Sequence, residues 1–381
     1  MEDNMNGRSG RLIQQPAGYK AFIPAPLPPD PSLHLDDESL VLLSNADMAL
    51  ARLDGISYVL PNPDLFILMY EKKEAVLSSQ IEGTQSSLAD VLDYEAGARA
   101  SRKNSDTKEV MNYLAALGHG IKRLEKLPLS SRLLREIHKI LMTGVRGQNK
   151  IPGEFRKTQN WIGSVGASLR EAAYVPPPAT DIVQMMGDLE KFIHADIALP
   201  ILVKCALIHY QFEAIHPFLD GNGRVGRLLV TFFLCWSGVL SEPMLYLSAF
   251  LNDNQQEYYD RLTAVRVRDD YEQWVAFFLR GVAETAGQAA DTAKRVIQLQ
   301  KTDREKIRAA GIESVYAFEI LDNLLARPII TVPDVVDKLH ISKQAATKII
   351  DKLEKIGIVR ETTGARRNRR YSYDALLELF G

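Results

Sequence analysis

The stretch HPFLDGNGRVGRLL, His216 to Leu229, carries a histidine, a carboxylate, a glycine-rich turn and two arginines directly before a long apolar run. Pro217 disfavours the α-helical region at His216, so a preceding helix is expected to end there. A second helix is expected over 224–236, where the side chains are mostly apolar. Two buried helices joined by a polar loop predict a largely helical core, with the chemistry gathered at the loop.

The glycine turn before the second helix predicts an anion site. Glycines let backbone amides turn toward one point, and a helix N-terminus adds unpaired donors and the positive end of a dipole. Cations in a first helical turn oppose that dipole, so stability does not account for Arg224 and Arg227, whereas a polyanionic ligand does. The residues expected to bind a polyphosphate are Gly221, Asn222, Gly223, Arg224 and Arg227.

Asp220 and His216 indicate which class of reaction this site catalyses. Asp220 would repel a bare polyphosphate but suits Mg²⁺, which bridges carboxylate and phosphate oxygens. A lone histidine is more often a core residue bonded to a carbonyl. Beside a phosphate site, however, His216 can act as a general base, because the ordinary pKa of histidine is about 6.5. We therefore predict nucleotidyl or phosphoryl transfer to an alcohol.

The pattern H-P-F-x-D-G-N-G-R-x-x-R at 216–227 resembles the complete signature of the Fic family, whose typical members transfer AMP from ATP to protein hydroxyls. The resemblance implies that His216 is the base and that Asp220 is the Mg²⁺ ligand. It places residues 221–224 around the α- and β-phosphates and Arg227 toward the γ-phosphate. We therefore expect an enzyme, a protein adenylyltransferase that uses ATP and Mg²⁺.

Other segments fit the same resemblance. The Doc branch of the family carries lysine where Gly223 stands, so Gly223 favours AMP transfer over phosphorylation. The segment 153–177 is similar to the loop and hairpin, or flap, that holds a target segment in extended form beside the site. The segment 252–262 resembles the helix that borders the adenine. Its candidate adenine contacts are Asn254, Tyr259 and Leu262, although tyrosine at helical spacing fits core packing equally well.

The stretch SSQIEG, 78–83, matches a second pattern of the family, Ser/Thr-x-x-x-Glu-Gly, which marks an inhibitory helix N-terminal to the core. Ser78 and Glu82 are four residues apart and share a helix face, and Gly83 follows. A carboxylate presented to the phosphate turn would pair with Arg227 and turn the α-phosphate of ATP away from attack. Alone, the pattern fits a helix end with a solvated glutamate; beside the complete motif it predicts autoinhibition. Some members of the family also remove AMP with the same glutamate, and the sequence leaves this open.

Composition restricts the other possibilities. The chain has 381 residues, 46% of them hydrophobic and 25% charged, which is typical of a globular protein with a sizeable core. A net charge of -2 argues against a protein that coats nucleic acid or anionic membrane throughout. Cys205 and Cys235 lie in apolar helical stretches, which favours a reducing cytoplasm over a disulfide framework. The N-terminus lacks a secretory signal, and the apolar window 228–240 is shorter than the ~20 residues that span a bilayer.

The C-terminal segment has the pattern of a winged helix. Residues 330–359 read as a helix, a turn at 340–341 and a second helix capped by Ser342, and a hairpin with a turn at Gly364 follows. The basic side chains in or beside this hairpin are Arg360, Arg366, Arg367, Arg369 and Arg370. A basic wing beside a recognition helix over 342–357 fits DNA, but such units also bind proteins, so the partner stays open. The alternative function is an ATP-responsive DNA-binding regulator that acts through this unit.

The predicted fold class is mainly α: a Fic-type helical core with a small β-hairpin flap, plus the C-terminal winged helix. Five regions are expected: a proline-rich strap (1–36), an N-terminal helical region with the inhibitory helix (37–110), the Fic core (111–297), a polar linker (298–312) and the winged helix (313–381). The expected partners are ATP, a target protein with an acceptor hydroxyl, a second copy in a homodimer, and DNA if the winged helix binds it. No membrane partner is expected.

Overall fold

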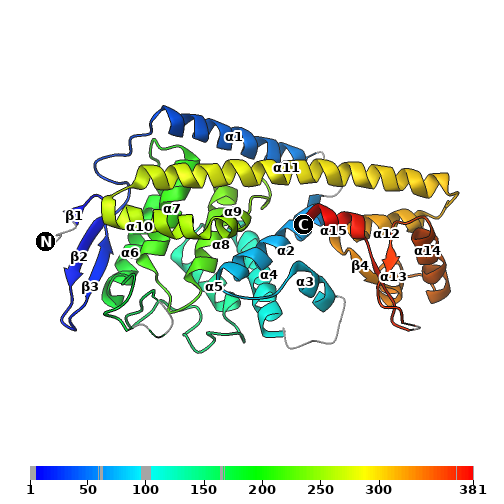
Figure 1. Cartoon of the computed structure of the whole chain (residues 1–381), viewed down its shortest axis with the longest axis horizontal. Helices are drawn as coiled ribbons and strands as arrows, with labels where there is room; N and C mark the ends of the chain where they lie inside the picture. The colour runs from blue at the N-terminus through cyan, green and yellow to red at the C-terminus, as the bar shows by residue number, and fades with distance from the viewer. Residues whose placement is uncertain are drawn as a thin grey trace.

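The computed structural model describes residues 6–58, 60, 63–95, 104–163, 166, 168–365 and 367–380. The chain is mainly helical, as predicted, with small β elements near both ends. Two long helices, α1 (Asp37–Ser57) and α11 (Tyr271–Ala309), run side by side along one edge of the molecule, and the other helices lie beneath them (Figure 1). Within the described ranges, no helix is both long enough and apolar enough to cross a membrane.

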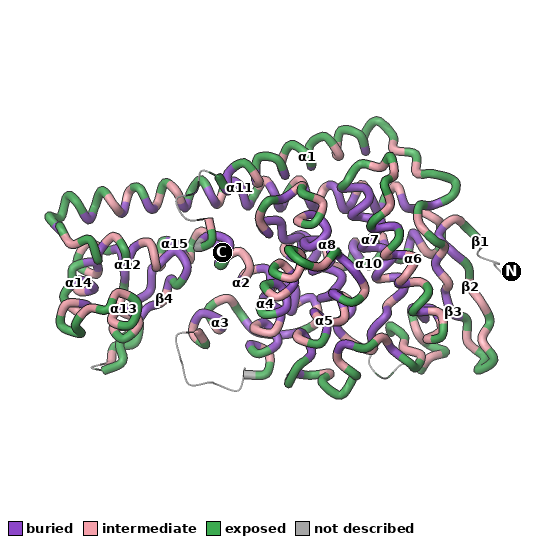
Figure 2. The backbone as a smooth tube through the Cα atoms, turned by 180° about the vertical axis from the view of Figure 1, so that it is seen from behind, coloured by how far each residue is buried: buried purple, intermediate pink, exposed green. Residues whose placement is uncertain are grey.

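The helical core is built around two buried helices, α7 (Ile201–Ile215) and α8 (Asn222–Trp236). Their sequences are apolar on nearly every face, which is the pattern of helices enclosed on all sides, and both lie deep in the molecule (Figure 2). The helices around them are α4 (Asn104–Leu124), α5 (Ser131–Leu141), α6 (Ile182–His194), α9 (Ser248–Asp253) and α10 (Gln255–Arg268), with a short 3-10 turn at Ala179–Asp181. The loop between α7 and α8 carries the motif of residues 216–227.

Helix α2 (Pro63–Ile81) connects this core to the C-terminal unit. It packs against α4 and α9 of the core and against α12 (Val315–Ala326) of the C-terminal unit. The short helix α3 (Leu88–Glu95) follows it and packs on α2 and α4. The predicted inhibitory helix is therefore in contact with both parts of the molecule.

The N-terminal segment differs from the predicted strap. Residues 6–24 form an antiparallel sheet of β1 (Asn6–Gly7), β2 (Gly10–Gln14) and β3 (Lys20–Pro24), with Gly10 opposite Pro24. Of the prolines that suggested a strap, Pro16 lies in the turn between β2 and β3, Pro24 is the last residue of β3, and the others follow this sheet. Prolines at these places are compatible with strand pairing. Strand β3 packs on α7, and its buried Phe22 side chain lies against Tyr174, with ring centroids 6.3 Å apart.

The expected linker is also part of a packed element. Helix α11 runs without a break through 298–309, although the sequence there is polar. The polar side chains bind the C-terminal unit: the Tyr373 hydroxyl donates to Asp303 Oδ2 at 2.6 Å, and Arg304 pairs with Asp322 at 2.7 Å. Residues 298–309 are therefore polar because they bind the C-terminal unit, and they do not form a solvent-exposed linker.

The C-terminal unit has the predicted helix-turn-helix and wing. Its elements after α12 are β4 (Ile329–Thr331), α13 (Val332–Leu339), α14 (Lys343–Lys355), β5 (Arg360–Glu361), β6 (Arg370–Ser372) and α15 (Asp374–Phe380), with sheet order β4-β6-β5. The turn places His340 at a φ of 52°, and the Ser342 hydroxyl caps α14 by accepting from the Ala345 amide at 3.2 Å. Gly364, with a φ of 62°, lies between the wing strands. Arg366 lies outside the described residues.

Candidate active site

The motif loop is closed by its own asparagine. His216 ends α7 with a φ of 50°, and Gly221 precedes α8 with a φ of 77°, so both ends of the loop use left-handed backbone. The Asn222 side chain accepts from the Phe218 amide and donates to the Phe218 carbonyl, each at 2.8 Å. The predicted phosphate contact of Asn222 is thus available only to its backbone amide, because its side chain is committed to the loop.

Removal of these two bonds has a measurable cost. For Asn222→Ala we expect the free energy of unfolding to fall by about 2–3 kcal/mol, because two buried hydrogen bonds are lost and the Phe218 amide is left unsatisfied. Chemical denaturation monitored by circular dichroism checks this. Asn254→Ala is the matched control, since among the described residues the Asn254 side-chain amide donates only to the Phe250 carbonyl of the preceding helix, at 2.9 Å. Equal losses in the two variants would contradict this role for Asn222.

A buried arginine from the flap region positions His216. Arg156 is 1% exposed, and its guanidinium donates to the carbonyls of His216 at 2.9 Å, Pro177 at 2.5 Å, and Ile215 and Thr158 at 3.4 Å. Burial lowers the pKa of Arg156 to about 10, so the group stays charged near neutrality. Carbonyls that have no helical partner need hydrogen-bond donors, and the Arg156 side chain donates to four carbonyls here.

His138 of α5 supports the loop from the other side. Its ring stacks on Phe218 with centroids 3.8 Å apart, and its Nδ1 accepts from the Gly153 amide at 2.9 Å. That acceptor role leaves the proton on Nε2, which donates to the Asp220 carbonyl at 3.0 Å. Burial lowers the pKa of His138 to about 4, so the ring is a neutral structural group.

The His216 side chain is largely buried, with 17% of its surface exposed. Its Nδ1 is buried without a hydrogen-bond partner in the described part of the chain, and the nearest carboxylate oxygen, Glu213 Oε2, is 3.9 Å away. Burial, and next the charge of Arg156, lowers the pKa of His216 to about 4. The imidazole is therefore neutral at pH 7, which is the form that accepts a proton.

Asp220 is the acidic residue of the loop and is accessible to solvent. Its side chain is 40% exposed, and its Oδ1 accepts from the Gly221 amide at 2.7 Å at the start of α8. The described residues include no group of three or more histidine, cysteine, aspartate or glutamate side chains that could hold a metal by themselves. One carboxylate beside a phosphate site is nevertheless the arrangement that Mg²⁺ uses when substrate phosphates complete its coordination, so the residues fit this ion.

The two arginines of α8 have different partners. Arg224, predicted to face the phosphates, is 2% exposed and pairs with Glu109 of α4, with Nη1 and Oε2 3.0 Å apart. Burial raises the pKa of Glu109, and the charge of Arg224 opposes that shift. The Arg224 guanidinium thus joins α8 to α4, while its backbone amide remains in the first turn of α8.

Arg227 faces the end of α2. Its Nη2 lies 2.8 Å from Glu82 Oε1, its Nε donates to the Ser78 hydroxyl at 2.8 Å, and its Nη2 also donates to the Ser78 carbonyl at 2.9 Å. A Cβ placed on Gly223 would be only 2.3 Å from Glu82 Oε1, so this carboxylate lies directly against the first turn of α8. Burial opposes ionisation of Glu82, but the charge of Arg227 outweighs it and lowers the pKa of Glu82.

Three family models match the chain. The model of the Fic/DOC family N-terminal region matches residues 40–122, and the Fic/DOC family model matches residues 128–234. The first match contains Ser78 and Glu82, and the second contains the whole motif. The chain belongs to the Fic/DOC family. A model of an HTH DNA binding domain matches residues 318–372 of this Fic protein.

Known relatives and solved structures agree with this assignment. The protein adenylyltransferase Fic of Drosophila grimshawi is 32% identical over 117 residues, 30% of this chain and 22% of that protein. A probable protein adenylyltransferase of Aquifex aeolicus is 25% identical over 176 residues, 46% of this chain and 51% of that protein. The Fic protein thus spans about a fifth of the first relative's length and half of the second's.

Two crystal structures have a similar fold. One, of a Fic family protein from Desulfovibrio desulfuricans G20, covers 90% of this chain and 97% of its own, with a TM-score of 0.56 and 20% identity. The other, of a Fic domain containing signaling protein from Bacteroides thetaiotaomicron, covers 65% and 95%, with a TM-score of 0.53 and 19% identity. At these identities the likeness concerns the fold.

The end of α2 in this Fic protein is held by further contacts. Arg146 Nη2 donates to the Glu82 carbonyl and Gln255 Nε2 donates to the Ile81 carbonyl, both at 3.2 Å. Gly83, with a φ of 90°, then reverses the chain. Glu82 is therefore fixed through its backbone as well as through Arg227.

The three candidate adenine contacts have unequal access. Tyr259 is 44% exposed. Partial burial raises the pKa of its hydroxyl, and the negative charge of Glu82 raises it further. Leu262 is a buried core residue, and the Asn254 amide is bonded within its own segment. Tyr259 is therefore the candidate with the most accessible surface near the phosphate site.

The predicted flap is a minimal hairpin. Ile162 and Tyr174 exchange two backbone hydrogen bonds, of 2.8 and 3.0 Å, while Trp161 and Ile162 are each 44% exposed. On the other side, the Phe22 amide of β3 donates to the Val175 carbonyl at 2.9 Å. The N-terminal sheet is thus joined to the flap by a backbone hydrogen bond, a contact that the strap prediction did not foresee.

A second buried acid, Glu213, lies beside the base. Its Oε1 has no hydrogen-bond partner among the described residues, and a Cβ on Gly226 would be 2.3 Å from that oxygen. Burial raises the pKa of Glu213 from 4.5 to about 7. No motif marks Glu213; its only signal is its place one turn before His216 on a mostly apolar helix.

This raised pKa predicts a pH dependence of stability. The native protein keeps the Glu213 proton up to about pH 7, whereas the unfolded chain releases it near pH 4.5. The stabilisation from protonated Glu213 is therefore complete below pH 4.5 and is lost as the pH rises through about 7. Glu213→Gln should remove this loss, so its stability relative to wild type should rise by about 2–3 kcal/mol between pH 4.5 and 8.

Denaturant unfolding of the two proteins across this pH range measures that difference. Glu125→Gln, at an exposed position, controls for the loss of a carboxylate as such. If the wild-type and Glu213→Gln curves stay parallel from pH 4.5 to 8, Glu213 does not titrate as described.

Proposed function

We propose that this Fic protein transfers AMP from ATP to a hydroxyl of a target protein and that α2 holds the site inactive. The observation that carries the proposal is the 2.8 Å ion pair between Glu82 and Arg227, because it puts a carboxylate against the amide-rich first turn of α8. An anion held at that place by the protein itself indicates that the turn suits the phosphates of a nucleotide. The relatives named as protein adenylyltransferases support the class of reaction.

The proposed reaction uses the chain's own groups at each point. The first turn of α8 binds the phosphates through the amides of residues 222–224, which precede the first helical bond, from Val225 to Gly221. The neutral imidazole of His216 takes the proton of the incoming hydroxyl, whose oxygen bonds to the α-phosphorus while pyrophosphate leaves. Asp220 would hold Mg²⁺, which neutralises phosphate charge when bound.

The proposed brake acts through position. With Glu82 on Arg227, that guanidinium cannot bind the γ-phosphate, so the triphosphate settles with its α-phosphorus out of line with the attacking hydroxyl. Near-attack geometry is worth several kcal/mol of barrier, so such a displacement slows transfer steeply. Release requires the end of α2 to leave Arg227, Arg146 and Gln255.

The proposed target lies along the flap. Residues 160–162 form the side of the hairpin opposite the β3 contact, and an extended segment can pair with this side through backbone bonds. Such pairing is nearly independent of sequence, so the position of the hydroxyl relative to His216 would decide which residue is modified.

The proposal is tested with a cell extract. Purified Glu82→Gly protein is incubated with extract, MgCl₂ and ATP labelled on the α-phosphate, and mass spectrometry locates the modified residues. The expected result is an added AMP on serine, threonine or tyrosine side chains of a small set of proteins. Label on no protein, including the enzyme itself, would exclude AMP transfer.

A second function is supported by the C-terminal unit. The matching model is that of a DNA-binding domain, and four lysines lie exposed on α14: Lys343, Lys348, Lys352 and Lys355. The wing contributes less than its sequence suggests, because Arg360 pairs with Asp374 at 2.5 Å and Arg370 with Asp93 of α3 at 3.0 Å. We therefore assign the DNA contact chiefly to α14.

This assignment predicts a salt-dependent interaction with duplex DNA. Lys348→Gln/Lys352→Gln should weaken binding about tenfold near 0.1 M salt and lower the slope of log K against log salt by nearly 2. Fluorescence anisotropy of a labelled duplex measures both quantities, and Arg360→Gln serves as the control with a small expected effect. Binding that does not change with salt or with the lysines would favour a protein partner.

Three further predictions from the sequence accompany this proposal: a homodimer, a cytoplasmic location, and removal of AMP by the same site. The division into five regions is likewise proposed, with 298–309 continuing α11 and 6–24 forming a sheet.

A further inference from the structure

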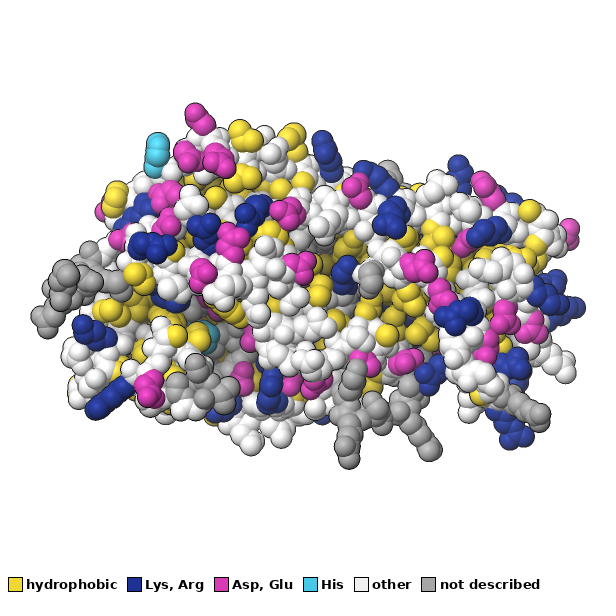
Figure 3. Space-filling view, viewed as in Figure 1, with side chains coloured by type: hydrophobic (Ala, Val, Ile, Leu, Met, Phe, Trp, Pro, Cys, Tyr) yellow, Lys and Arg dark blue, Asp and Glu magenta, His cyan; other side chains and the backbone are white. Residues whose placement is uncertain are grey.

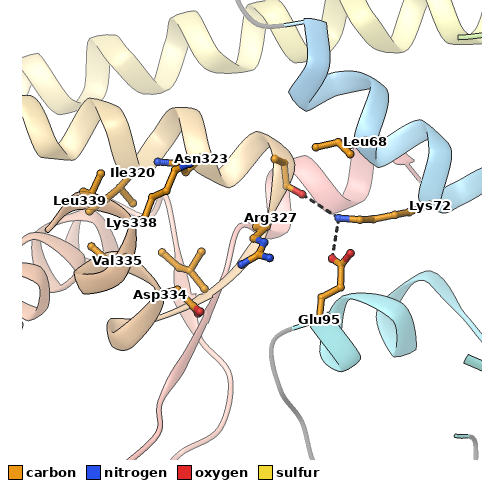
Figure 4. A pocket seen from close by; sticks show the side chains of 12 residues that line it. Leu68, Lys72, Glu95, Ile320, Asn323, Arg327, Asp334, Val335, Lys338 and Leu339 are labelled. Atoms are coloured by element: carbon orange, nitrogen blue, oxygen red, sulfur yellow. Dashed lines mark hydrogen bonds and ion pairs between the residues drawn. The ribbon is translucent and has the colours of Figure 1, made fainter. Parts of the chain in front are cut away.

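A pocket of about 490 Å³ lies between α2 and the C-terminal unit, away from the motif loop (Figure 4). Its wall on the C-terminal side is apolar and buried, formed by Ile320 of α12, Ile330 of β4 and Val335 of α13. Leu68 of α2 faces it and is 41% exposed. Hydrophobic side chains are visible where the core meets the C-terminal unit (Figure 3). The volume is within the ~300–1,000 Å³ range of small-molecule sites.

Two of the charged groups at this pocket are already satisfied within the protein. Lys72 of α2, 4% exposed, donates to the Ala326 carbonyl at 3.1 Å and pairs with Glu95 at 2.8 Å (Figure 4). Asp334 accepts from the amide and the hydroxyl of Thr331 in the capping box of α13. None of these groups needs a ligand.

Two cations at the pocket have no such partner. The side chains of Arg327 and Lys338 line it, and neither forms an ion pair or hydrogen bond with any residue that the structure describes. The charged lining consists of three cations and two anions: Lys72, Arg327, Lys338, Glu95 and Asp334. A single negative charge would make this lining neutral, and Arg327 offers a planar fork that matches a carboxylate.

We propose that this pocket binds a small amphipathic carboxylate. An apolar body of about eight to ten carbons would lie between Leu68 and the wall formed by Ile320 and Val335, and its carboxylate would bind Arg327 and Lys338. A neutral or cationic molecule of the same length contacts the apolar wall but leaves the excess positive charge of the lining uncompensated.

The ligand would act on the position of α2. Leu68 and Lys72 lie one turn apart on the half of α2 that contacts the C-terminal unit, where Tyr70 also packs on Phe380 with ring centroids 5.2 Å apart. The other end of α2 carries Glu82. A ligand that bridges α2 and the C-terminal unit binds best to the arrangement seen here, so by linkage it stabilises that arrangement. The effect of the ligand on AMP transfer rests on the proposed role of α2 as the brake, whereas the binding of the ligand does not.

The test uses the full chain and octanoate as the probe. Isothermal titration calorimetry should show one octanoate per chain, with 1-octanol and octylamine at least about tenfold weaker. Hydrogen exchange measured by mass spectrometry should show slower exchange of the α2 amides when octanoate is present. Both measurements are independent of ATP and of AMP transfer.

Variants separate this site from adventitious binding. Arg327→Gln/Lys338→Gln should weaken octanoate at least about tenfold by removing the cations, and Asn323→Trp should weaken it by filling the pocket from α12. Lys348→Gln/Lys352→Gln removes two cations from the same unit outside the pocket and should leave octanoate binding unchanged. The proposal is overturned if octanoate does not bind, if 1-octanol binds as tightly, if both pocket variants bind normally, or if α2 exchange does not slow. If only the Glu82→Gly prediction fails, the brake hypothesis is rejected and the proposed binding site is unaffected.

Discussion

Replacement of Glu82 by glycine is expected to raise the rate of AMP transfer at least about tenfold, because each ~1.4 kcal/mol removed from the barrier is a factor of ten. The substitution deletes the carboxylate that lies 2.8 Å from Arg227 Nη2 and opens the space above Gly223. Arg227 keeps its bonds to Ser78, so its guanidinium stays in place and becomes available to the γ-phosphate. Auto-modification with labelled ATP and Mg²⁺ measures the rate.

Two companion variants identify the cause of this increase. Glu82→Gln keeps the size of the side chain and removes its charge, so it should give a smaller increase than glycine. Gln80→Gly loosens the same end of α2 but keeps the Glu82 carboxylate on Arg227, so it should raise the rate by less than Glu82→Gly does. Equal turnover of wild type and Glu82→Gly would remove the brake hypothesis, and an equal increase in Gln80→Gly would assign the effect to helix stability.

The sequence predicted the parts of this site that depend on local rules. Pro217 ends α7 and the glycine turn starts α8, because both residues restrict or release the backbone at their own position. The contact between Glu82 and Arg227 spans 145 residues, yet it was predicted because each residue belongs to a recognisable pattern. A resemblance thus supplied a long-range contact that periodicity could not.

The residues that the sequence missed share a different property. Arg156 binds loop carbonyls about 60 residues away, and Glu109 pairs with Arg224 across 115 residues. Their partners are set by tertiary packing, and an arginine or glutamate within a helix or loop has no periodic signal that distinguishes such a partner from solvent. His138 was the exception with a usable signal, since it shares the apolar face of Leu134 and Leu141 on α5.

The two differences in secondary structure have the same origin. The polar stretch 298–309 continues α11 because Asp303 and Arg304 find partners on the C-terminal unit, which composition alone cannot indicate. The segment 6–24 pairs as a sheet because Phe22 is buried and its amide reaches Val175. In both cases, tertiary contacts changed the reading of a segment that is weakly apolar by sequence.

His216→Ala in the Glu82→Gly background is expected to lower AMP transfer at least about a hundredfold, since general-base catalysis contributes roughly 10²–10⁴. The wild-type imidazole is neutral at pH 7, because burial lowers the pKa of His216 to about 4, and alanine leaves no group to take the hydroxyl proton. The substitution leaves in place the Arg156 bond to the residue 216 carbonyl and the Asn222 closure of the loop, neither of which involves the imidazole. The phosphate turn should therefore keep its shape.

ATP affinity separates loss of the base from loss of the site. Isothermal titration with a non-hydrolysable ATP analogue and Mg²⁺ should give dissociation constants within about threefold of each other for Glu82→Gly and Glu82→Gly/His216→Ala, a difference below ~0.7 kcal/mol. His119→Ala, at a histidine of α4 whose partner is Glu136, controls for removal of an imidazole elsewhere in the core. Transfer that persists without His216 would require another base. Loss of nucleotide binding together with transfer would instead mean that the imidazole supports the fold of the loop, and the assignment of the proton to His216 would then fail.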